Sequence, residues 1–177
     1  MPVPDIDAWS LATPRLLIRP ARVEDAEAMH WIRGQMPYDP QHRDVPETRA
    51  MIADMAALPA GAPGWRQFAL LPATGGALLG DVGVRFDHPG PWQAEIGFAL
   101  HPAMRGKGFA TEAVGAIVER LFANGIHRVQ ALTDARNIAT QRLLVRLRFR
   151  REAHYVQSWR DGDNWSDEFG YARLASD

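Results

Sequence analysis

The sequence predicts an α/β fold in which one mixed sheet carries helices on its faces, with the element order β-α-α-β-β-β-α-β-α-β-β. Three observations lead to this prediction. Short segments rich in branched and aromatic residues end at proline or glycine turns, as strands do. Longer segments repeat apolar residues every three or four positions, as amphipathic helices do. The two kinds of segment alternate without an internal repeat, which favours a layered sheet over a helical repeat.

Proline and glycine turns bound the elements expected in the first half of the chain. The first dozen residues show no regular pattern, and Pro20 ends the strand that follows them. Pro46 opens the second helix, because proline is tolerated in a first helical turn. We expect a strand over 15–20, helices over 24–35 and 46–58, and strands over 65–71, 78–86 and 93–100.

The second half begins with the strongest helical pattern of the sequence. Apolar residues recur at helical spacing from Ala110 to Leu121, and Asn124-Gly125 ends the helix because glycine suits a left-handed cap. A polar turn over 161–164 joins the last two strands as a hairpin. We expect helices over 108–123 and 137–147 and strands over 127–133, 149–159 and 165–174.

Composition restricts the class of protein. The chain has 177 residues, of which 46% are hydrophobic and 23% charged, and we expect one domain over 1–177. A net charge of −1 gives no field that would attract nucleic acid or an anionic membrane. The absence of cysteine excludes disulfides, thiolate metal sites and a cysteine nucleophile. With no apolar run of about 18 residues and no secretory signal, we expect a soluble cytoplasmic protein.

The segment Arg105-Gly106-Lys107-Gly108-Phe109-Ala110-Thr111 follows an expected strand and opens an expected helix. The first amides of a helix lack partners and carry partial positive charge. Glycines let the backbone approach a phosphate closely, and Arg105 and Lys107 add full charges. The segment therefore predicts a site for a diphosphate or similar anion, the alternative being a plain tight turn.

Two common phosphate motifs fit this segment poorly. A P-loop fails on spacing, because the residue five positions before Gly106 is His101. A dinucleotide fingerprint would need glycine or alanine where Thr111 stands, although Asp134 lies about where a ribose-binding acid might be. A dinucleotide-binding oxidoreductase therefore stays open as a weaker interpretation.

Two segments together point to a family. The run 95–102 followed by 105–113 resembles the acyl-CoA motif of the GNAT N-acetyltransferases, Q/R-x-x-G-x-G/A, which Arg105, Gly108 and Ala110 fill. The run 137–140 resembles the family's second signature, with threonine in place of serine.

Residues near the two ends of the chain indicate which branch of the family the sequence resembles. Residues 13–19 and 161–168 are similar to the ribosomal-protein N-terminal acetyltransferase (RimJ/RimL-like) branch, and the resemblance covers about residues 11–174. It implies the GNAT fold, with a mostly antiparallel sheet, and direct transfer of acetyl from acetyl-CoA to a primary amine in a ternary complex. The acceptor would be a protein N-terminus or a small molecule.

The resemblance also implies how acetyl-CoA, a co-substrate, would bind. In the family, the loop amides hold the pyrophosphate, the strand backbone pairs with pantetheine, and the motif asparagine meets the cofactor arm. The residues expected to bind it are Phe98, Ala99, Leu100, Arg105, Gly106, Lys107, Gly108, Phe109, Ala110, Thr111, Asn137 and Arg142. No metal is expected, because the histidines are scattered without ligand spacing.

The attacking amine must be neutral, so a base helps at neutral pH. By resemblance, Glu95 is the expected base and Thr140 the acid that assists the leaving thiolate. The alternatives are a salt-bridged strand glutamate and a hydroxyl that caps a helix start. The family's frequent catalytic tyrosine is replaced by Leu144, and the branch's late glutamate falls near Ser158 or Trp159. These departures leave open a non-catalytic acyl-CoA-binding module.

The acceptor site is expected in the first two helices, their connecting loop and the last hairpin. Acidic side chains there would attract a cationic amine, although ordinary turn chemistry also explains them. The residues are Trp31, Tyr38, Asp39, His42, Asp44 and the hairpin 161–168. The arginines between 136 and 151 are interpreted as a solvated face rather than a nucleic-acid site. We expect a monomer or homodimer that binds neither nucleic acid nor membrane.

Overall fold

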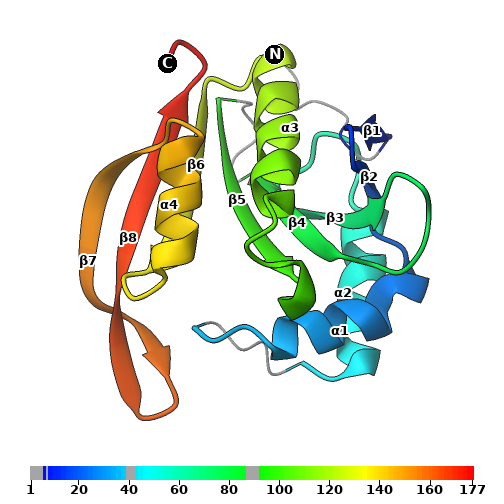
Figure 1. The fold of residues 1–177 in the computed structure, drawn as a ribbon, viewed down its shortest axis with the longest axis horizontal. Coiled ribbons are helices and arrows are strands. Elements are labelled where there is room, and N and C mark those ends of the chain that lie inside the picture. The colour runs from blue at the N-terminus through cyan, green and yellow to red at the C-terminus, as the bar shows by residue number, and fades with distance from the viewer. Residues whose placement is uncertain (1–5, 7, 39–42, 87–91) are drawn as a thin grey trace.

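A computed structural model gives the structure of this protein and describes residues 6, 8–38, 43–86 and 92–177. One eight-stranded sheet has the order β1-β2-β3-β4-β5-β6-β8-β7 (Figure 1). The strands are β1 (Leu11–Ala12), β2 (Leu16–Pro20), β3 (Gly64–Pro72), β4 (Gly80–Phe86), β5 (Gln93–Leu100), β6 (Arg128–Asp134), β7 (Arg150–Asp161) and β8 (Asn164–Leu174).

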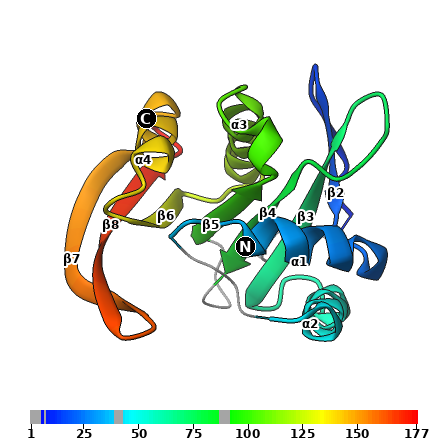
Figure 2. The same ribbon diagram turned by 60° about the horizontal axis from the view of Figure 1, so that its bottom comes forward.

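Helices cover both faces of this sheet. Figure 2 shows α3 and α4 on one side and α1 and α2 on the other. The helices are α1 (Ala26–Gly34), α2 (Val45–Ala57), α3 (Phe109–Ala123) and α4 (Ile138–Arg146), with short 3-10 turns η1 (Val23–Asp25) and η2 (Pro102–Met104). The predicted order of elements and the mixed, mostly antiparallel sheet are confirmed.

The sheet is antiparallel except where β5 meets β6. That parallel pair is short: it runs from Gln93 opposite Arg128 to Glu95 opposite Gln130. Beyond it β5 continues to Leu100, and β6 continues to Asp134, without pairing with each other. The two halves of the sheet therefore separate at this point, and among the described residues no strand pairs with this edge of β5 over residues 96–100.

The main core lies between α3 and the sheet. Helix α3 buries a stripe at helical spacing that includes Val114, Ile117 and Leu121, and this stripe packs against strand residues such as Phe68 and Ile96. A smaller cluster under α1 and α2 joins Ala21, Ala26, Met29 and Ile52. Helix α3 thus packs against β5, the strand that precedes it in the chain.

The N-terminal segment differs from the prediction. Residues before Arg15 were expected to be irregular, but Leu11–Ala12 forms the edge strand β1 against β2. Ile6 and Trp9 are buried in the main core, at 2% and 5% exposure. Two apolar residues in an irregular segment carry no periodic signal, so only the surface they cover reveals their role.

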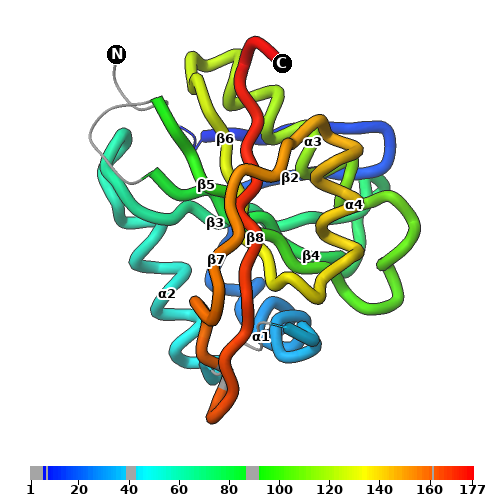
Figure 3. Tube along the Cα trace, turned by 90° about the vertical axis from the view of Figure 1, so that its left-hand side faces the viewer, coloured from blue at the N-terminus to red at the C-terminus, as the bar shows by residue number. Residues whose placement is uncertain are grey.

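At the other edge of the sheet, β7 and β8 form a long hairpin and run side by side (Figure 3). Its register shifts between Arg151 and Ala153 and again between Tyr155 and Trp159. Such bulges bend a strand and redirect its side chains. In the described residues, no helix is both long and apolar enough to cross a membrane.

Candidate active site

Two adjoining cavities occupy the opening between the separated strands. The larger, of about 630 Å³, lies between the end of β5, the start of α3 and helix α4. The smaller, of about 150 Å³, extends between β5 and β6 toward the last hairpin. Residues that line both cavities are Met36, Tyr38, Phe98, Asn137 and Thr140. The site therefore reaches through the sheet from one face to the other.

The loop before α3 presents backbone amides to the larger cavity. Gly106 and Gly108 have left-handed φ angles of 74° and 82°, a conformation that costs little only for glycine. Gly108 is the N-cap of α3 and no side chain caps the helix. The first helical hydrogen bond runs from Glu112 N to Gly108 O at 3.0 Å, so the amides before it lack an intrahelical partner.

This arrangement suits an anion. Gly106, Gly108, Ala110 and Thr111 all line the larger cavity. A Cβ at Gly106 would meet nothing within 4 Å, so a ligand can approach the backbone closely there. The helix dipole adds partial positive charge at the same point.

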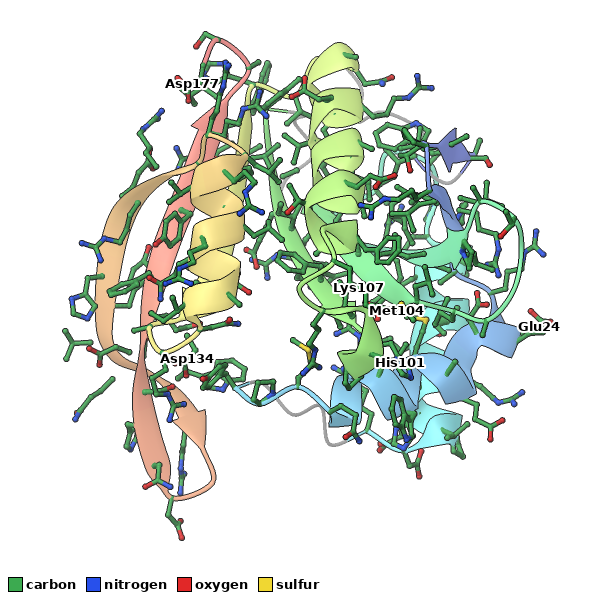
Figure 4. All side chains as sticks on the ribbon, viewed as in Figure 1. Glu24, His101, Met104, Lys107, Asp134 and Asp177 are labelled. Carbon is green, nitrogen blue, oxygen red and sulfur yellow. The ribbon has the colours of Figure 1, made fainter. Side chains whose placement is uncertain are left out.

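Arg105 contributes mainly by holding this loop. Its Nε donates to Leu100 O at 3.2 Å, and its Nη2 donates to Gln35 O at 3.0 Å. The guanidinium thus ties the loop to the end of β5 and to the residue that follows α1. In Figure 4, Met104 and Lys107 lie on this loop below α3, with His101 at its start.

Arg15 and Glu112 secure the outer side of the loop. Arg15 Nη1 donates to Lys107 O at 2.9 Å, and its guanidinium lies 4.4 Å from the centre of the Phe109 ring. Glu112 accepts from Thr13 Oγ1 and from Arg15 Nε, both at 2.6 Å. Burial opposes ionisation of Glu112, but these hydrogen bonds outweigh it and lower the pKa of the carboxyl.

Helix α4 forms the facing wall and begins differently. Asn137 is its N-cap, and Asn137 Oδ1 accepts from Thr140 N at 3.2 Å. Arg142 and Arg146, one helical turn apart, line the larger cavity together with Arg136. Arg142, which was expected to bind the cofactor, therefore lines this cavity, and Arg136 and Arg146 of the expected solvated face line it too while remaining exposed.

Asp134 ends β6 beside the start of α4 (Figure 4). Arg136 donates to it twice through its side chain, Nε to Oδ1 at 2.9 Å and Nη2 to Oδ2 at 2.7 Å. These hydrogen bonds lower the pKa of the Asp134 carboxyl. Asp134 is thus already paired, and it lines the smaller cavity as half of an ion pair.

The expected cofactor residues fall into two groups. Those that line the larger cavity are Phe98, Leu100, Arg105, Gly106, Gly108, Ala110, Thr111, Asn137 and Arg142. The others are Ala99, which is 2% exposed, and Lys107 and Phe109, which contact Arg15. The sequence analysis did not single out Met36 or Ile138, whose place in the cavity depends on how the segment after α1 and the start of α4 pack.

The two expected catalytic residues lie apart. Thr140 lines both cavities. Glu95 lines neither, and its Oε2 pairs with Arg85 Nη2 at 2.6 Å and lies 3.5 Å from Gln130 Nε2. Leu144, at the family's tyrosine position, is fully buried in the core and offers no hydroxyl.

The expected acceptor residues are also divided. Tyr38 lines both cavities, 5.3 Å beneath the Arg136 guanidinium. Trp31 is 48% exposed and stacks on His101 with ring centres 4.8 Å apart. Asp44 caps α2 by accepting from Glu47 N at 2.8 Å. His42 and Asp39 lie outside the described residues.

In the described part of the chain, no group of three or more histidine or carboxylate side chains is placed to hold a metal ion.

Comparison with known proteins identifies the class to which this fold and site belong. Residues 15–150 match the acetyltransferase (GNAT) domain family, so the chain belongs to the GNAT acetyltransferases, which transfer an acetyl group to an amine. This membership confirms the sequence resemblance and does not favour a dinucleotide-binding oxidoreductase.

Individual relatives agree with that assignment. An uncharacterized N-acetyltransferase of Bacillus subtilis, YnaD, is 34% identical over 98 residues, which are 55% of this chain and 57% of YnaD. The match thus spans little more than half of that relative's length. A GNAT acetyltransferase structure from Bacillus anthracis has a TM-score of 0.81 at 26% identity and covers 96% of this chain and 100% of its own.

A third match is a solved structure with the same fold. The structure of Mycobacterium smegmatis RimJ in complex with a CoA disulfide has a TM-score of 0.78 at 22% identity, covering 91% of this chain and 82% of that one. At this identity the likeness shows the fold alone.

Proposed function

We propose that this protein binds acetyl-CoA in the larger cavity and transfers the acetyl group to a primary amine that enters through the smaller one. The observation that carries the proposal is the separation of β5 and β6 after the pair Glu95–Gln130, directly beside the uncapped start of α3. One opening thus joins an anion-binding helix end to both faces of the sheet.

The residues that line the larger cavity suit the parts of the cofactor. The backbone N–H groups of Gly108 to Thr111 would donate hydrogen bonds to the diphosphate, and Arg142 and Arg146 would add positive charge. The unpaired edge of β5 over residues 96–100 would hydrogen-bond the extended pantetheine arm, as an added strand does. The thioester would then lie near Thr140, where the two cavities meet.

Transfer is proposed to proceed by direct attack. The neutral amine nitrogen forms a bond to the acetyl carbon, and the carbon–sulfur bond then breaks. The Thr140 hydroxyl donates a proton to the leaving sulfur and receives one from the nitrogen. Glu95, the base expected from the sequence, is held by Arg85 away from the cavities, so its role has to be tested against other carboxylates.

Titration calorimetry with acetyl-CoA, and with NADH as the control, tests the cofactor. We expect saturable micromolar binding of acetyl-CoA and none of NADH. A folded protein that binds no acetyl-CoA would overturn the proposal. Binding without any turnover would favour the non-catalytic acyl-CoA-binding module.

Release of the CoA thiol then reports turnover, and the background is low because the chain has no cysteine. An acceptor panel consists of peptides that begin with serine or alanine and of the polyamine spermidine. Peptide turnover would indicate a protein N-terminus as acceptor, and spermidine turnover a small amine. We place this activity in the cytoplasm and require no metal for it, so added EDTA should leave the rate unchanged.

A further inference from the structure

Glu168 lies where an acceptor amine would meet the acetyl group. It is a residue of β8 and lines the smaller cavity together with Thr140 and Tyr38. Glu168 faces Asp134 of β6 in the strand register. Register partners share a face of the sheet, as do residues two apart on a strand. Ala172, four residues after Glu168 on β8, lies opposite Gln130 of β6. Gln130 in turn lies opposite Glu95 of β5, so Glu168 and Glu95 lie on the same face of the sheet.

That face is the one opposite the core helix α3. Ile96 faces α3 in the main core, so its neighbour Glu95 points to the side of α1 and α2. The proposed cofactor cavity lies against α3 and α4. Glu168 is therefore positioned to approach the reaction centre from the side opposite the cofactor, which is the side left for the acceptor.

Among the carboxylates near the opening, Glu168 differs in its partners. Asp134 is paired with Arg136, and Glu95 with Arg85. Glu168 Oε2 accepts from Ser158 Oγ at 2.9 Å, and no ion pair joins Glu168 to a cation in the described part of the chain. A carboxylate that no cation neutralises attracts an incoming ammonium group, whereas a carboxylate in an ion pair already has a cationic partner.

A bulge in β7 builds this contact. Gln157 has a left-handed φ of 49°, within the register shift between Tyr155 and Trp159. Asp167 holds the bulge, because its Oδ1 accepts from Gln157 N at 2.9 Å and its Oδ2 lies 2.7 Å from His154 Nε2. The bulge turns the Ser158 hydroxyl onto Glu168 and lets Trp159 line the smaller cavity.

We propose that Glu168 is the catalytic base that takes a proton from the acceptor ammonium group; this inference rests on the acetyl transfer proposed above. The amine has an ordinary pKa of ~8 at a protein N-terminus or ~10.4 on a lysine-like chain, so it enters protonated. One proton passes to Glu168 and then to solvent. The freed nitrogen lone pair forms the amide bond, the sulfur keeps the electron pair of the broken bond, and the second nitrogen proton reaches it through Thr140.

The test compares Glu168→Gln, Glu95→Gln and the control Glu152→Gln, using the fastest acceptor of the panel. Glu152 belongs to the same hairpin, pairs with Arg128 and lines neither cavity. At pH 7 we expect E168Q to lower kcat/KM by about 100-fold or more, a typical contribution of a general base. E152Q should keep the wild-type kcat/KM. The kcat/KM of E95Q should stay at least about tenfold higher than that of E168Q. The acetyl-CoA Kd of E168Q should stay within about twofold.

The pH profile separates a base from a structural residue. Wild-type kcat/KM should be nearly level from pH 7 up to the pKa of the amine, because Glu168 takes the proton from the bound ammonium group. In E168Q it should rise roughly tenfold per pH unit up to the pKa of the amine, because only the free amine then reacts. A profile in E168Q that stays level, or a larger loss in E95Q, would overturn the assignment while leaving the acetyltransferase function intact. Absence of transfer by the wild-type protein would instead overturn the function itself, and the assignment with it.

Discussion

Helices α3 and α4 both begin at the larger cavity, but they satisfy their first amides in opposite ways. Helix α4 is capped by Asn137, whose side chain accepts from Thr140 N. Helix α3 begins at Gly108 in a left-handed conformation and has no side-chain cap. An amide that already has an acceptor gains little from a ligand, whereas an uncapped one gains a full hydrogen bond. Two helix ends in one cavity are therefore not equivalent anion sites.

The two helices also differ in how they are anchored. The first turn of α3 carries Glu112, which accepts hydrogen bonds from Thr13 and Arg15, two residues from the start of the chain that lie beside α3 in the fold. The first turn of α4 carries no acidic residue. The start of α3 thus has no side-chain cap, but contacts with Thr13 and Arg15 hold it in place. These contacts keep its uncapped amides in a fixed position for a ligand. This is the pre-organisation that reduces the cost of binding.

The largest expected effect on cofactor binding is that of Gly108→Ala. A left-handed alanine costs about 1–2 kcal/mol, and a Cβ here would lie 3.3 Å from Arg15 Nη2, so the loop must shift. We expect calorimetry to show an acetyl-CoA Kd raised about 10- to 100-fold.

The matched variant at the other helix is Asn137→Ala, which removes a cap. It should cost about 1 kcal/mol in the free energy of unfolding but raise the acetyl-CoA Kd less than G108A does. Equal losses of affinity in the two variants would show that the difference between the helix ends does not determine binding.

Next in size is the pH-dependent effect of Glu112→Gln on stability. Because the folded-state pKa of Glu112 is lowered, its carboxylate stabilises the fold fully above its ordinary pKa of 4.5. That contribution is lost as the pH falls from 4.5 through the lowered value. Urea unfolding should show E112Q less stable by about 1–3 kcal/mol at pH 7, and the difference should shrink at pH 3. A difference that stays constant with pH would contradict the ionic anchor.

The smallest effect concerns the opposite ends of the same helices. Helix α3 is followed by Gly125 at φ 87°, whereas α4 is followed by Arg148 at φ 65°, a conformation that favours glycine. We expect Arg148→Gly to raise the unfolding free energy by about 0.5–1 kcal/mol. Gly125→Ala should lower it by about 1 kcal/mol. Thermal unfolding of the pair measures both, and an R148G variant less stable than the wild type would contradict the strain argument.

Much of the site could be predicted from the sequence because it is local. The glycine loop and its place before a helix follow from adjacent residues whose spacing has a direct physical meaning. The parts that could not be predicted depend on residues far apart in the chain. Glu95 is an acid on the expected strand, but only its pairing with Arg85, on the neighbouring strand, removes it from the cavities.

Glu168 shows the reverse case. In the sequence it is one acid among several in the hairpin 161–168, and only tertiary contact distinguishes it. The distinction requires the separation of β5 from β6, a cavity that reaches β8, and a bulge in β7 that supplies Ser158. Bulges are set by a few backbone angles and by one carboxylate, Asp167, and they leave no periodic signal.

By itself the sequence determined the order of elements from β2 onward, the α/β class, the family and the glycine loop at the start of α3. These follow from hydrophobic periodicity, turn chemistry and short-range capping, all of which act over a few residues. Tertiary structure alone decided which carboxylates line the smaller cavity, which arginines line the larger one and that Ile6 and Trp9 belong to the core. Those features depend on long-range packing and strand register, because a side chain's partners are fixed only when the sheet is assembled.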